Sequence, residues 1–344
     1  MKIALCSTSV PFVNGGYRNI VDWLATALKA EGHAVETIYL PENDDPDLLL
    51  PQMMAFRSID LSMADMVICF RPQAHLISHP NKVIWFIHHI RPLYDLWDTE
   101  YRGMEQSERT IGLRDTIRSI DTAALAEASK LFANSTVTAQ RLLKFNGLES
   151  RVLYPPVNEP ERFRFVEQND EILCICRMEH HKRQHLLIDA MSRTRSAVRL
   201  RLCGVGSSAA YPESLEKQVA ELGIGDRVTI DHRWIGEEDK QELLGRCLAM
   251  AYLPFDEDSY GYPTLEAALS SKPILTTSDA GGVLEFVEHE ASGLICEPEP
   301  EALAAAMDRL FEDRAGAKRM GKGALGRISD LAINWPSTIA ALLS

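Results

Sequence analysis

The chain has 344 residues, of which 46% are hydrophobic and 25% charged, and its formal net charge is −13. This length exceeds one ordinary core and suits two domains of roughly 150 residues each. The acidity argues against nucleic acid as the main partner, because a phosphate backbone favours a densely basic surface, and the composition has no fibrous or disordered bias.

The first half alternates short apolar runs with amphipathic segments. Helical periods occupy segments such as 20–32 and 121–130. The opening MKIALCSTSV is read as a buried strand rather than a signal peptide, since its apolar run is only four residues long. Runs rich in Val, Ile and Leu predict parallel strands at 2–7, 34–40, 66–70, 82–87, 130–134 and 151–156.

Pro155, Pro156 and Pro160 predict a stiff linker, so we expect a first domain over 1–163 and a second over 164–328. The second half repeats the alternation, with helices such as 184–193 and 263–271 between the strands. Strands each followed by a helix indicate an α/β fold of two doubly wound parallel sheets. The predicted strands of this half are 171–176, 198–204, 227–231, 249–254, 273–277 and 293–298.

The number of cysteines and the distribution of charge indicate the cellular compartment in which the protein works. The seven cysteines are odd in number and mostly lie in apolar runs, so we expect free thiols in a reducing cytoplasm. No run approaches the roughly 20 apolar residues of a membrane span. The first half is closer to neutral than the second, which is compatible with peripheral contact between the N-terminal domain and the inner face of an anionic membrane.

A candidate anion site follows the strand at 249–254. Pro263 suits the first position of a helix, and Gly261 lets a ligand approach its free backbone N–H groups. Glu266 is placed in the first turn of that helix. Its carboxylate would repel a bare phosphate, so we expect it to accept hydrogen bonds from ribose hydroxyls. The alternative is a glutamate that only stabilises the helix dipole.

A second candidate lies in CRMEHHKRQHLLIDA, residues 176–190. Arg177 directly follows a predicted strand, and Lys182 comes five residues later, just before a helix. Two cations at the carboxyl end of a strand, facing an anion-binding helix, suit a diphosphate leaving group that no metal neutralises. The alternative is a pair of solvated surface charges.

Together these segments resemble the retaining glycosyltransferases of family 4, which have the GT-B fold. RMEHHKRQHLLIDA is similar to the family's Arg-x4-Lys segment, and DSYGYPTLEAALSSKPILTTSDAGGVLEFVEHEASGLI is similar to its E-x7-E region and the Gly-Gly loop that follows. In the first half, PFVNGGYRNIVDWLATALKAEGHAVE, FANSTVTAQRL and LYPPVN also resemble family segments. The final segment, 329–344, looks like the family's helix that returns to the N-terminal domain.

The resemblance implies two Rossmann-like domains that face each other across a cleft. It also implies retaining transfer from a nucleotide-sugar such as a UDP- or GDP-sugar to a hydroxyl acceptor, without a metal or other cofactor. The acceptor would be a glycan, a glycolipid or a cell-surface polysaccharide precursor, which includes lipid-linked acceptors. Nucleic acid would not be a partner.

The resemblance also implies a role for each matching residue. Arg177 and Lys182 bind the diphosphate, Asp258 contacts sugar hydroxyls and His88 lies near the reacting carbon, so these four form the predicted catalytic set. Glu266 binds the ribose, and the base is read around Arg233. The predicted donor-binding set is Gly15, Gly16, Gly204, Arg233, Gly261, Tyr262, Pro263, Thr264, Leu265 and Glu266.

Two departures from the family pattern leave alternatives open. The first carboxylate of E-x7-E is Asp258 here, and Arg18 stands where the family often has glutamate. These changes permit a catalytically weak subunit that binds a nucleotide-sugar, and a GT-B sugar-nucleotide epimerase is a third possibility. Slow donor hydrolysis would distinguish an enzyme from a pure binding module.

Two further function classes have weaker support in the sequence. Asp256-Glu257-Asp258 and Asp45-Pro46-Asp47 are D-x-D patterns of the kind that hold a divalent cation in GT-A transferases, but such patterns are common by chance in a chain with 49 acidic residues. A dehydrogenase is disfavoured because no G-x-G-x-x-G follows the first strand.

Overall fold

The computed structural model describes residues 1–11, 16–43 and 45–344 and divides them into two compact units. The first unit comprises residues 1–156 together with 333–344, and the second comprises 157–332. The divisions therefore fall after Pro156 and Ala332 instead of after residues 163 and 328. Burial explains the first difference, because Val157 and Phe163, which follow the prolines, have their side chains buried in the second unit.

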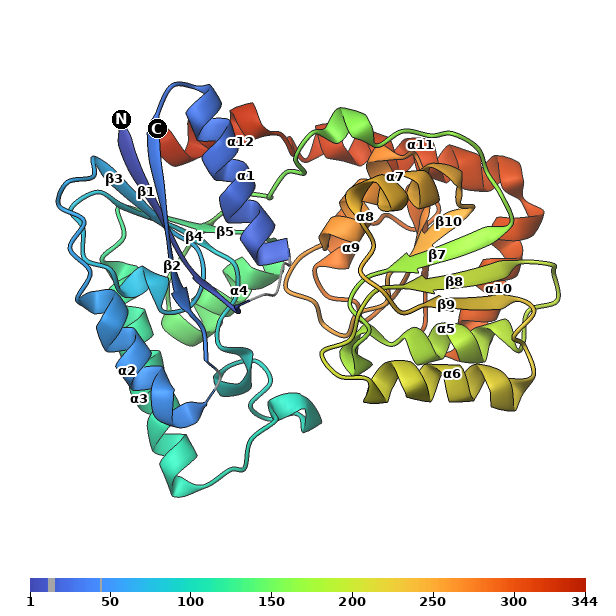
Figure 1. Ribbon diagram of the computed structural model, residues 1–344, viewed down its shortest axis with the longest axis horizontal. Coiled ribbons are helices and arrows are strands. Elements are labelled where there is room, and N and C mark those ends of the chain that lie inside the picture. The colour runs from blue at the N-terminus through green and yellow to red at the C-terminus, as the bar shows by residue number, and fades with distance from the viewer. Residues whose placement is uncertain (12–15, 44) are drawn as a thin grey trace. The chain divides into compact units, whose positions relative to one another are not determined.

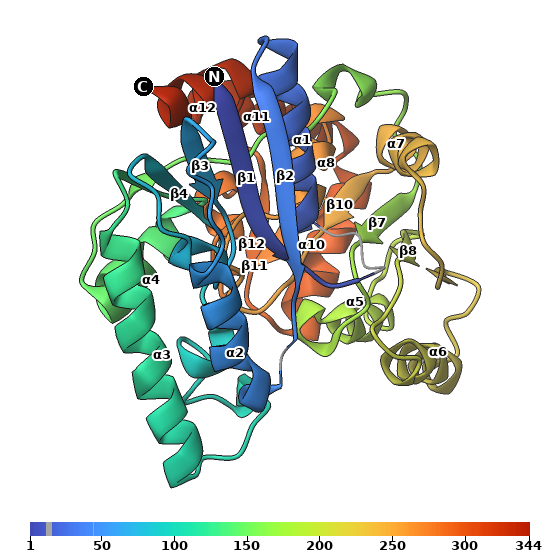
Figure 2. The same cartoon turned by 60° about the vertical axis from the view of Figure 1, so that its left-hand side comes forward.

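The first unit is built on a six-stranded parallel sheet with the order β2-β1-β3-β4-β5-β6. Figures 1 and 2 show α1 and α12 on one face of this sheet and α2, α3 and α4 on the other. The elements are β1 (Lys2–Ser9), α1 (Gly16–Ala30), β2 (Ala34–Pro41), α2 (Pro46–Arg57), β3 (Met66–Cys69), β4 (Lys82–Phe86), α3 (Glu108–Ala126), β5 (Lys130–Ala133), α4 (Thr136–Asn146), β6 (Arg151–Val152) and α12 (Trp335–Leu343).

The second unit has a six-stranded parallel sheet with the order β12-β11-β10-β7-β8-β9. Helices α5, α6 and α10 lie on one face, and α7, α8 and α11 on the other (Figure 1). The elements are β7 (Glu171–Ile175), α5 (Gln184–Met191), β8 (Arg199–Cys203), α6 (Ala210–Leu222), β9 (Val228–Asp231), α7 (Glu237–Arg246), β10 (Ala249–Ala251), α8 (Tyr262–Leu269), β11 (Ile274–Thr277), α9 (Val283–Phe286), β12 (Gly293–Cys296), α10 (Pro300–Glu312) and α11 (Arg314–Asp330).

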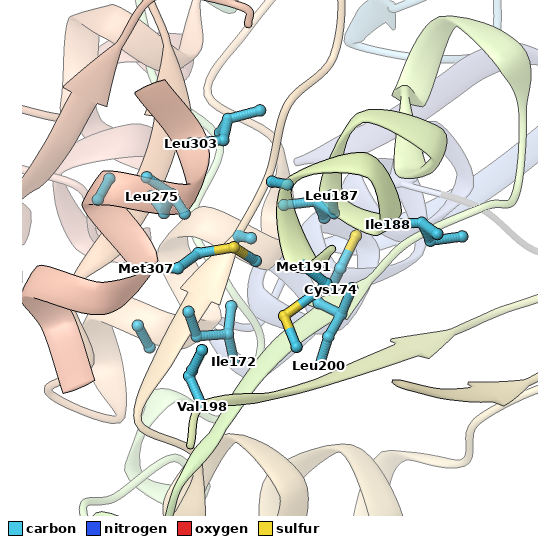
Figure 3. Packing of buried hydrophobic residues seen from close by; sticks show 14 of the residues in the cluster. Ile172, Cys174, Leu187, Ile188, Met191, Val198, Leu200, Leu275, Leu303 and Met307 are labelled. Carbon is cyan, nitrogen blue, oxygen red and sulfur yellow. The ribbon is translucent and has the colours of Figure 1, made fainter. Parts of the chain in front are cut away.

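The central strands are buried on both faces because their apolar runs do not alternate with polar residues. Every residue of β3, β4, β10 and β11 is buried. In the second unit, Ile172 and Cys174 of β7 and Leu200 of β8 pack against Leu187 of α5 and Met307 of α10, which Figure 3 shows from close by. This packed sheet fixes the strand ends from which the loops of the candidate site emerge.

The sequence predictions of the fold are confirmed in detail. Each of the twelve predicted strands is present, and all of them pair in parallel with their neighbours. All seven cysteines are free thiols. Among the residues that the structure describes, no helix is both long and apolar enough to cross a membrane.

Candidate active site

The loops after β7, β8, β9, β10 and β11 of the second unit emerge at the carboxyl edge of its sheet, where ligands bind in open parallel α/β folds. Backbone hydrogen bonds tie the loops together. The loop after β10 meets the loop after β7 through Phe255, whose N–H donates to the carbonyl oxygen of His181 at 2.9 Å. It meets the loop after β11 through Gly282, whose N–H donates to the carbonyl oxygen of Glu257 at 2.8 Å. The predicted donor residues therefore lie on segments that hold one another in place.

Lys182 ends a short 3₁₀ helix, His180–Lys182, and is buried. Its Nζ donates to the Tyr252 hydroxyl at 3.0 Å and forms an ion pair with Glu257. The ammonium also lies 5.2 Å from the centre of the Tyr252 ring. The acidic partner of this predicted catalytic lysine is thus Glu257, while Asp258 is the next residue of the same loop and is half-buried.

Arg177 lies two residues beyond the end of β7 and is exposed. Its carbonyl oxygen accepts a hydrogen bond from Nε2 of Gln184 at 2.9 Å, which ties the loop to the start of α5. Its guanidinium forms no ion pair with the residues of the described ranges. Burial, followed by the charges of Lys182 and Arg177, lowers the pKa of His181 to about 4, so both cations act on the same imidazole.

Gly261 precedes α8 in a conformation that requires glycine. Its φ is +71°, and a Cβ atom there would lie 2.6 Å from Cε1 of Tyr252. Pro263 has no N–H, and the N–H of Thr264 already donates to the carbonyl oxygen of Gly261 at 3.2 Å. The helix start therefore offers fewer free amides to an anion than the sequence suggested.

One side chain at the start of α8, that of Thr264, is buried with its polar atom still available. The hydroxyl of Thr264 has no hydrogen-bond partner among the described residues, whereas buried polar atoms are normally paired. Leu265, the next predicted residue, is an apolar side chain of the same buried turn. The unpaired hydroxyl of Thr264 makes this turn suitable for binding a polar ligand.

Glu266 lies in the second turn of α8 and not in the first, because the helix begins at Tyr262. Its side chain is only 4% exposed, and its Oε1 accepts from Nζ of Lys240 at 2.7 Å. Burial raises the pKa of Glu266 to about 7, although Lys240 acts in the opposite direction. A role of Glu266 in stabilising the dipole of α8 is therefore disfavoured, because the dipole acts mainly on charges in the first turn of a helix.

Gly204 and Arg233 follow β8 and β9. Gly204 has a φ of +141°, and a Cβ atom would lie 2.0 Å from the carbonyl oxygen of Cys176, so glycine is needed where the two loops touch. Arg233 is exposed, and its guanidinium pairs with Asp231 at 3.0 Å and Asp239 at 2.8 Å. Its charge is therefore compensated by carboxylates of β9 and α7, the elements on either side of its loop.

The remaining predicted residues belong to the first unit. His88 comes two residues after β4, and its Nδ1 lies 2.7 Å from the carbonyl oxygen of His89. Since a carbonyl only accepts, Nδ1 carries the proton and Nε2 is an acceptor. Burial, then the charge of Arg71, lowers the pKa of His88 to about 3, so the imidazole is neutral at neutral pH. Gly16 begins α1, and Gly15 lies outside the described residues.

Sequence reasoning missed Arg183, which ties the loops after β7, β10 and β11. The buried guanidinium forms a bidentate ion pair with Asp279, with both contacts at 2.7 Å. It also donates to the carbonyl oxygens of Leu253 at 2.7 Å and Pro254 at 3.1 Å, and to Oγ1 of Thr277 at 2.8 Å. The only signal in the sequence is an arginine directly after Lys182, and nothing there identifies partners as distant as Asp279.

The carboxylates of the two D-x-D patterns lie in different elements and have different partners. Asp45 caps α2 by accepting from the N–H of Asp47 at 2.9 Å, and Asp47 pairs with Arg109. Asp256 and Asp258 flank Glu257, which pairs with Lys182. Within the described ranges, no three His, Cys, Asp or Glu side chains are grouped as a metal site would require.

Residues 158–327 match the model of a protein family described as glycosyl transferases group 1. The alpha-1,3/1,6-mannosyltransferase ALG2 of Homo sapiens is 23% identical over 304 residues, which cover 80% of this chain and 70% of that protein. The glycogen synthase of Mycobacterium tuberculosis is 30% identical over 177 residues, which cover 50% of this chain and 41% of that protein.

Solved structures resemble the chain over nearly its whole length. The sucrose-phosphate synthase of Thermosynechococcus elongatus has a TM-score of 0.80 at 19% identity, covering 98% of this chain and 97% of that one. HepE of Anabaena, solved with UDP-glucose, has a TM-score of 0.72 at 16% identity, covering 99% of this chain and 98% of that one. These similarities confirm the predicted GT-B fold class.

Proposed function

We propose that the chain is a glycosyl transferase of group 1, the family whose model residues 158–327 match, and that it is a retaining hexosyltransferase that uses a nucleoside diphosphate sugar. The observation that carries this proposal is the cation pair in the loop after β7. Arg177 is exposed and has no ion pair with the described residues, and Lys182 is buried in the same loop. Such a pair stabilises a departing diphosphate.

The proposed mechanism is front-face transfer. The bond between the anomeric carbon and the phosphate oxygen breaks, and negative charge develops on that oxygen. The acceptor hydroxyl attacks from the same face, forms the new glycosidic bond and gives its proton to the leaving phosphate. Arg177 and Lys182 stabilise the developing charge, and the ammonium of Lys182, which donates to Tyr252 and Glu257, has a third N–H for the phosphate.

Other residues of the second unit receive binding roles. We assign the ribose hydroxyls to the carboxylate of Glu266, which is held in a buried position on α8. The turn from Gly261 to Thr264 contacts the phosphates, supported by the unpaired Thr264 hydroxyl. Asp258 contacts hydroxyls of the donor sugar.

His88 of the first unit contributes as a neutral acceptor through Nε2, in keeping with its lowered pKa and its contact to His89. A neutral imidazole accepts a hydrogen bond from a sugar hydroxyl without adding charge. This role belongs to substrate positioning and needs no proton transfer by the histidine.

The donor is proposed to be a UDP- or GDP-sugar. HepE of Anabaena, which shares the fold, was solved with UDP and with UDP-glucose, which favours a uridine nucleotide as the first to test. The acceptor is proposed to be a hydroxyl of a glycan or glycolipid, which includes lipid-linked forms. We also propose peripheral contact between the first unit and a membrane.

Replacing Lys182 tests the proposal. After thermal-shift selection of the donor that binds, Lys182→Ala should lower the rate of donor hydrolysis or transfer by about 10²- to 10³-fold, by analogy with the loss of one donor from an oxyanion hole. Lys217→Ala is the matched control, because Lys217 is 76% exposed on α6 and its ion-pair partner within the described part of the chain is Glu221. Near-normal turnover of Lys182→Ala would contradict the assignment.

The same assay with EDTA tests the proposed independence from metals. The rate should be unchanged, because side-chain cations replace the divalent ion. Loss of activity with recovery on adding Mg²⁺ or Mn²⁺ would show that the cations do not suffice.

A further inference from the structure

A buried ion pair between α7 and α8 is not used by the mechanism. Nζ of Lys240 donates to Oε1 of Glu266 at 2.7 Å, and the two side chains are 13% and 4% exposed. Lys240 also donates to Glu237 at 2.8 Å and lies 5.8 Å from the centre of the Phe163 ring. A lysine on one helix therefore reaches the carboxylate that we assign to the ribose.

Only one carboxylate oxygen of Glu266 is engaged. Oε2 has no hydrogen-bond partner among the residues of the described ranges, while Oε1 accepts from Lys240. A carboxylate oxygen accepts hydrogen bonds and donates none when it is ionised. The lysine thus fixes the orientation of the group and leaves acceptor capacity for hydroxyls.

The charge state of Glu266 depends on its neighbours. The charged or titratable groups that act on it are Lys240 and Glu237 from α7 and Tyr262 from α8. Burial raises its pKa, the charge of Lys240 lowers it and the charge of Glu237 raises it, with a result of about 7. Without Lys240, the pKa would lie higher and the carboxyl would be protonated at neutral pH.

We infer that Lys240 is a positioning residue for nucleoside diphosphate recognition, which holds the Glu266 carboxylate ionised and oriented to accept hydrogen bonds from the ribose hydroxyls. This inference rests on the proposed function, because it needs a ribose at Glu266. A protonated carboxyl would donate one hydrogen bond and accept less strongly, so it would suit a vicinal diol less well.

The test is calorimetric titration of the full chain with UDP and GDP between pH 6 and 9. Wild-type affinity should rise as the pH passes about 7, since the ionised carboxylate binds the diol. Lys240→Met should move that midpoint upward by about one pH unit or more, which weakens binding about fivefold or more at pH 7 and restores most of it at pH 9. Lys240→Arg keeps the charge and should resemble wild type.

Two controls separate this role from a structural one. Lys217→Met on α6 should leave the profile unchanged. The 2′,3′-dideoxynucleoside diphosphate should bind wild type and Lys240→Met equally, because it lacks the hydroxyls that Glu266 accepts. If Lys240→Met fails to fold, Lys240→Gln provides the uncharged variant.

The outcomes distinguish the two proposals. If wild type binds neither UDP nor GDP, the proposed function fails, and the role of Lys240 fails with it. If wild type binds one of them but Lys240→Met keeps the wild-type midpoint, only the role of Lys240 is wrong. Equal losses for the ribose and dideoxy ligands would also overturn it, since they would indicate a structural effect or a phosphate contact.

Discussion

At the scale of single residues, burial gives similar side chains different behaviour. Glu266 is buried and its pKa rises to about 7, whereas Glu301 is exposed, and a hydrogen bond from its own backbone N–H, followed by one from Arg193, lowers its pKa. Lys182 and Lys217 differ in the same way, because one is buried against Glu257 and the other is exposed on α6. Among the charges assigned to donor binding, water screens those of Lys182 and Glu266 least, because both side chains are buried.

Glu266→Gln should change how stability depends on pH. The folded pKa of Glu266 lies above the ordinary value of 4.5, so the folded state binds the proton more tightly, and this contribution to stability is present at low pH and lost as the pH rises towards 7. The free energy of unfolding of wild type should therefore fall more between pH 5 and 8 than that of Glu266→Gln, by on the order of 1 to 3 kcal/mol. Urea titrations of both proteins at the two pH values measure this difference, and equal slopes would contradict the raised pKa.

At the scale of elements, the strands are regular and the loops after them carry the specific contacts. Arg183 adopts a left-handed conformation with φ of +56° and bonds to groups after β10 and β11. Gly261 and Gly204 allow close approach beside Tyr252 and Cys176. The loops that carry Arg183, Gly204 and Gly261 thus each contain a residue whose conformation or hydrogen bonds depend on contact with a neighbouring segment.

Gly261→Ala should disturb the site through Tyr252. A Cβ atom would lie 2.6 Å from the Tyr252 ring, whose hydroxyl contacts Lys182. The control is Gly223→Ala at the end of α6, where φ is +66° and nothing lies within 4 Å, so only backbone strain of about 1 to 2 kcal/mol is expected. Urea unfolding and kcat should both change more for Gly261→Ala, and matching values for the two variants would show that the ring contact is unimportant.

At the scale of the whole molecule, the chain forms two units, and its last segment belongs to the first. Helix α12 packs against α1, with Ile339 and Leu342 buried, and Nζ of Lys130 donates to the carbonyl oxygen of Leu342 at 3.4 Å. The prediction of a returning helix at 329–344 agrees with this placement, although the division falls after Ala332.

Removal of residues 333–344 should therefore destabilise the first unit selectively. Burial of Ile339 and Leu342 contributes roughly 1.5 to 3 kcal/mol each. Hydrogen exchange should become faster in β1 and α1 and stay unchanged in β7 and α5. Deletion of Ser344 alone is the control, since that residue is exposed. Equal acceleration in both units would mean that α12 stabilises the molecule as a whole.

The twelve strands, the two parallel sheets and the segments that carry Arg177, Lys182 and Glu266 could be predicted from the amino-acid sequence, because strand and helix periods and short motifs are local properties. The partners of these side chains are visible in the folded structure alone. Lys182 meets Glu257 across 75 residues, Arg183 meets Asp279 across 96, and Lys240 meets Glu266 across 26. The strand and helix periods of the sequence do not predict such pairs. The pairs depend on which loops the strand order of the sheet brings to the same edge and on how deeply each side chain is buried.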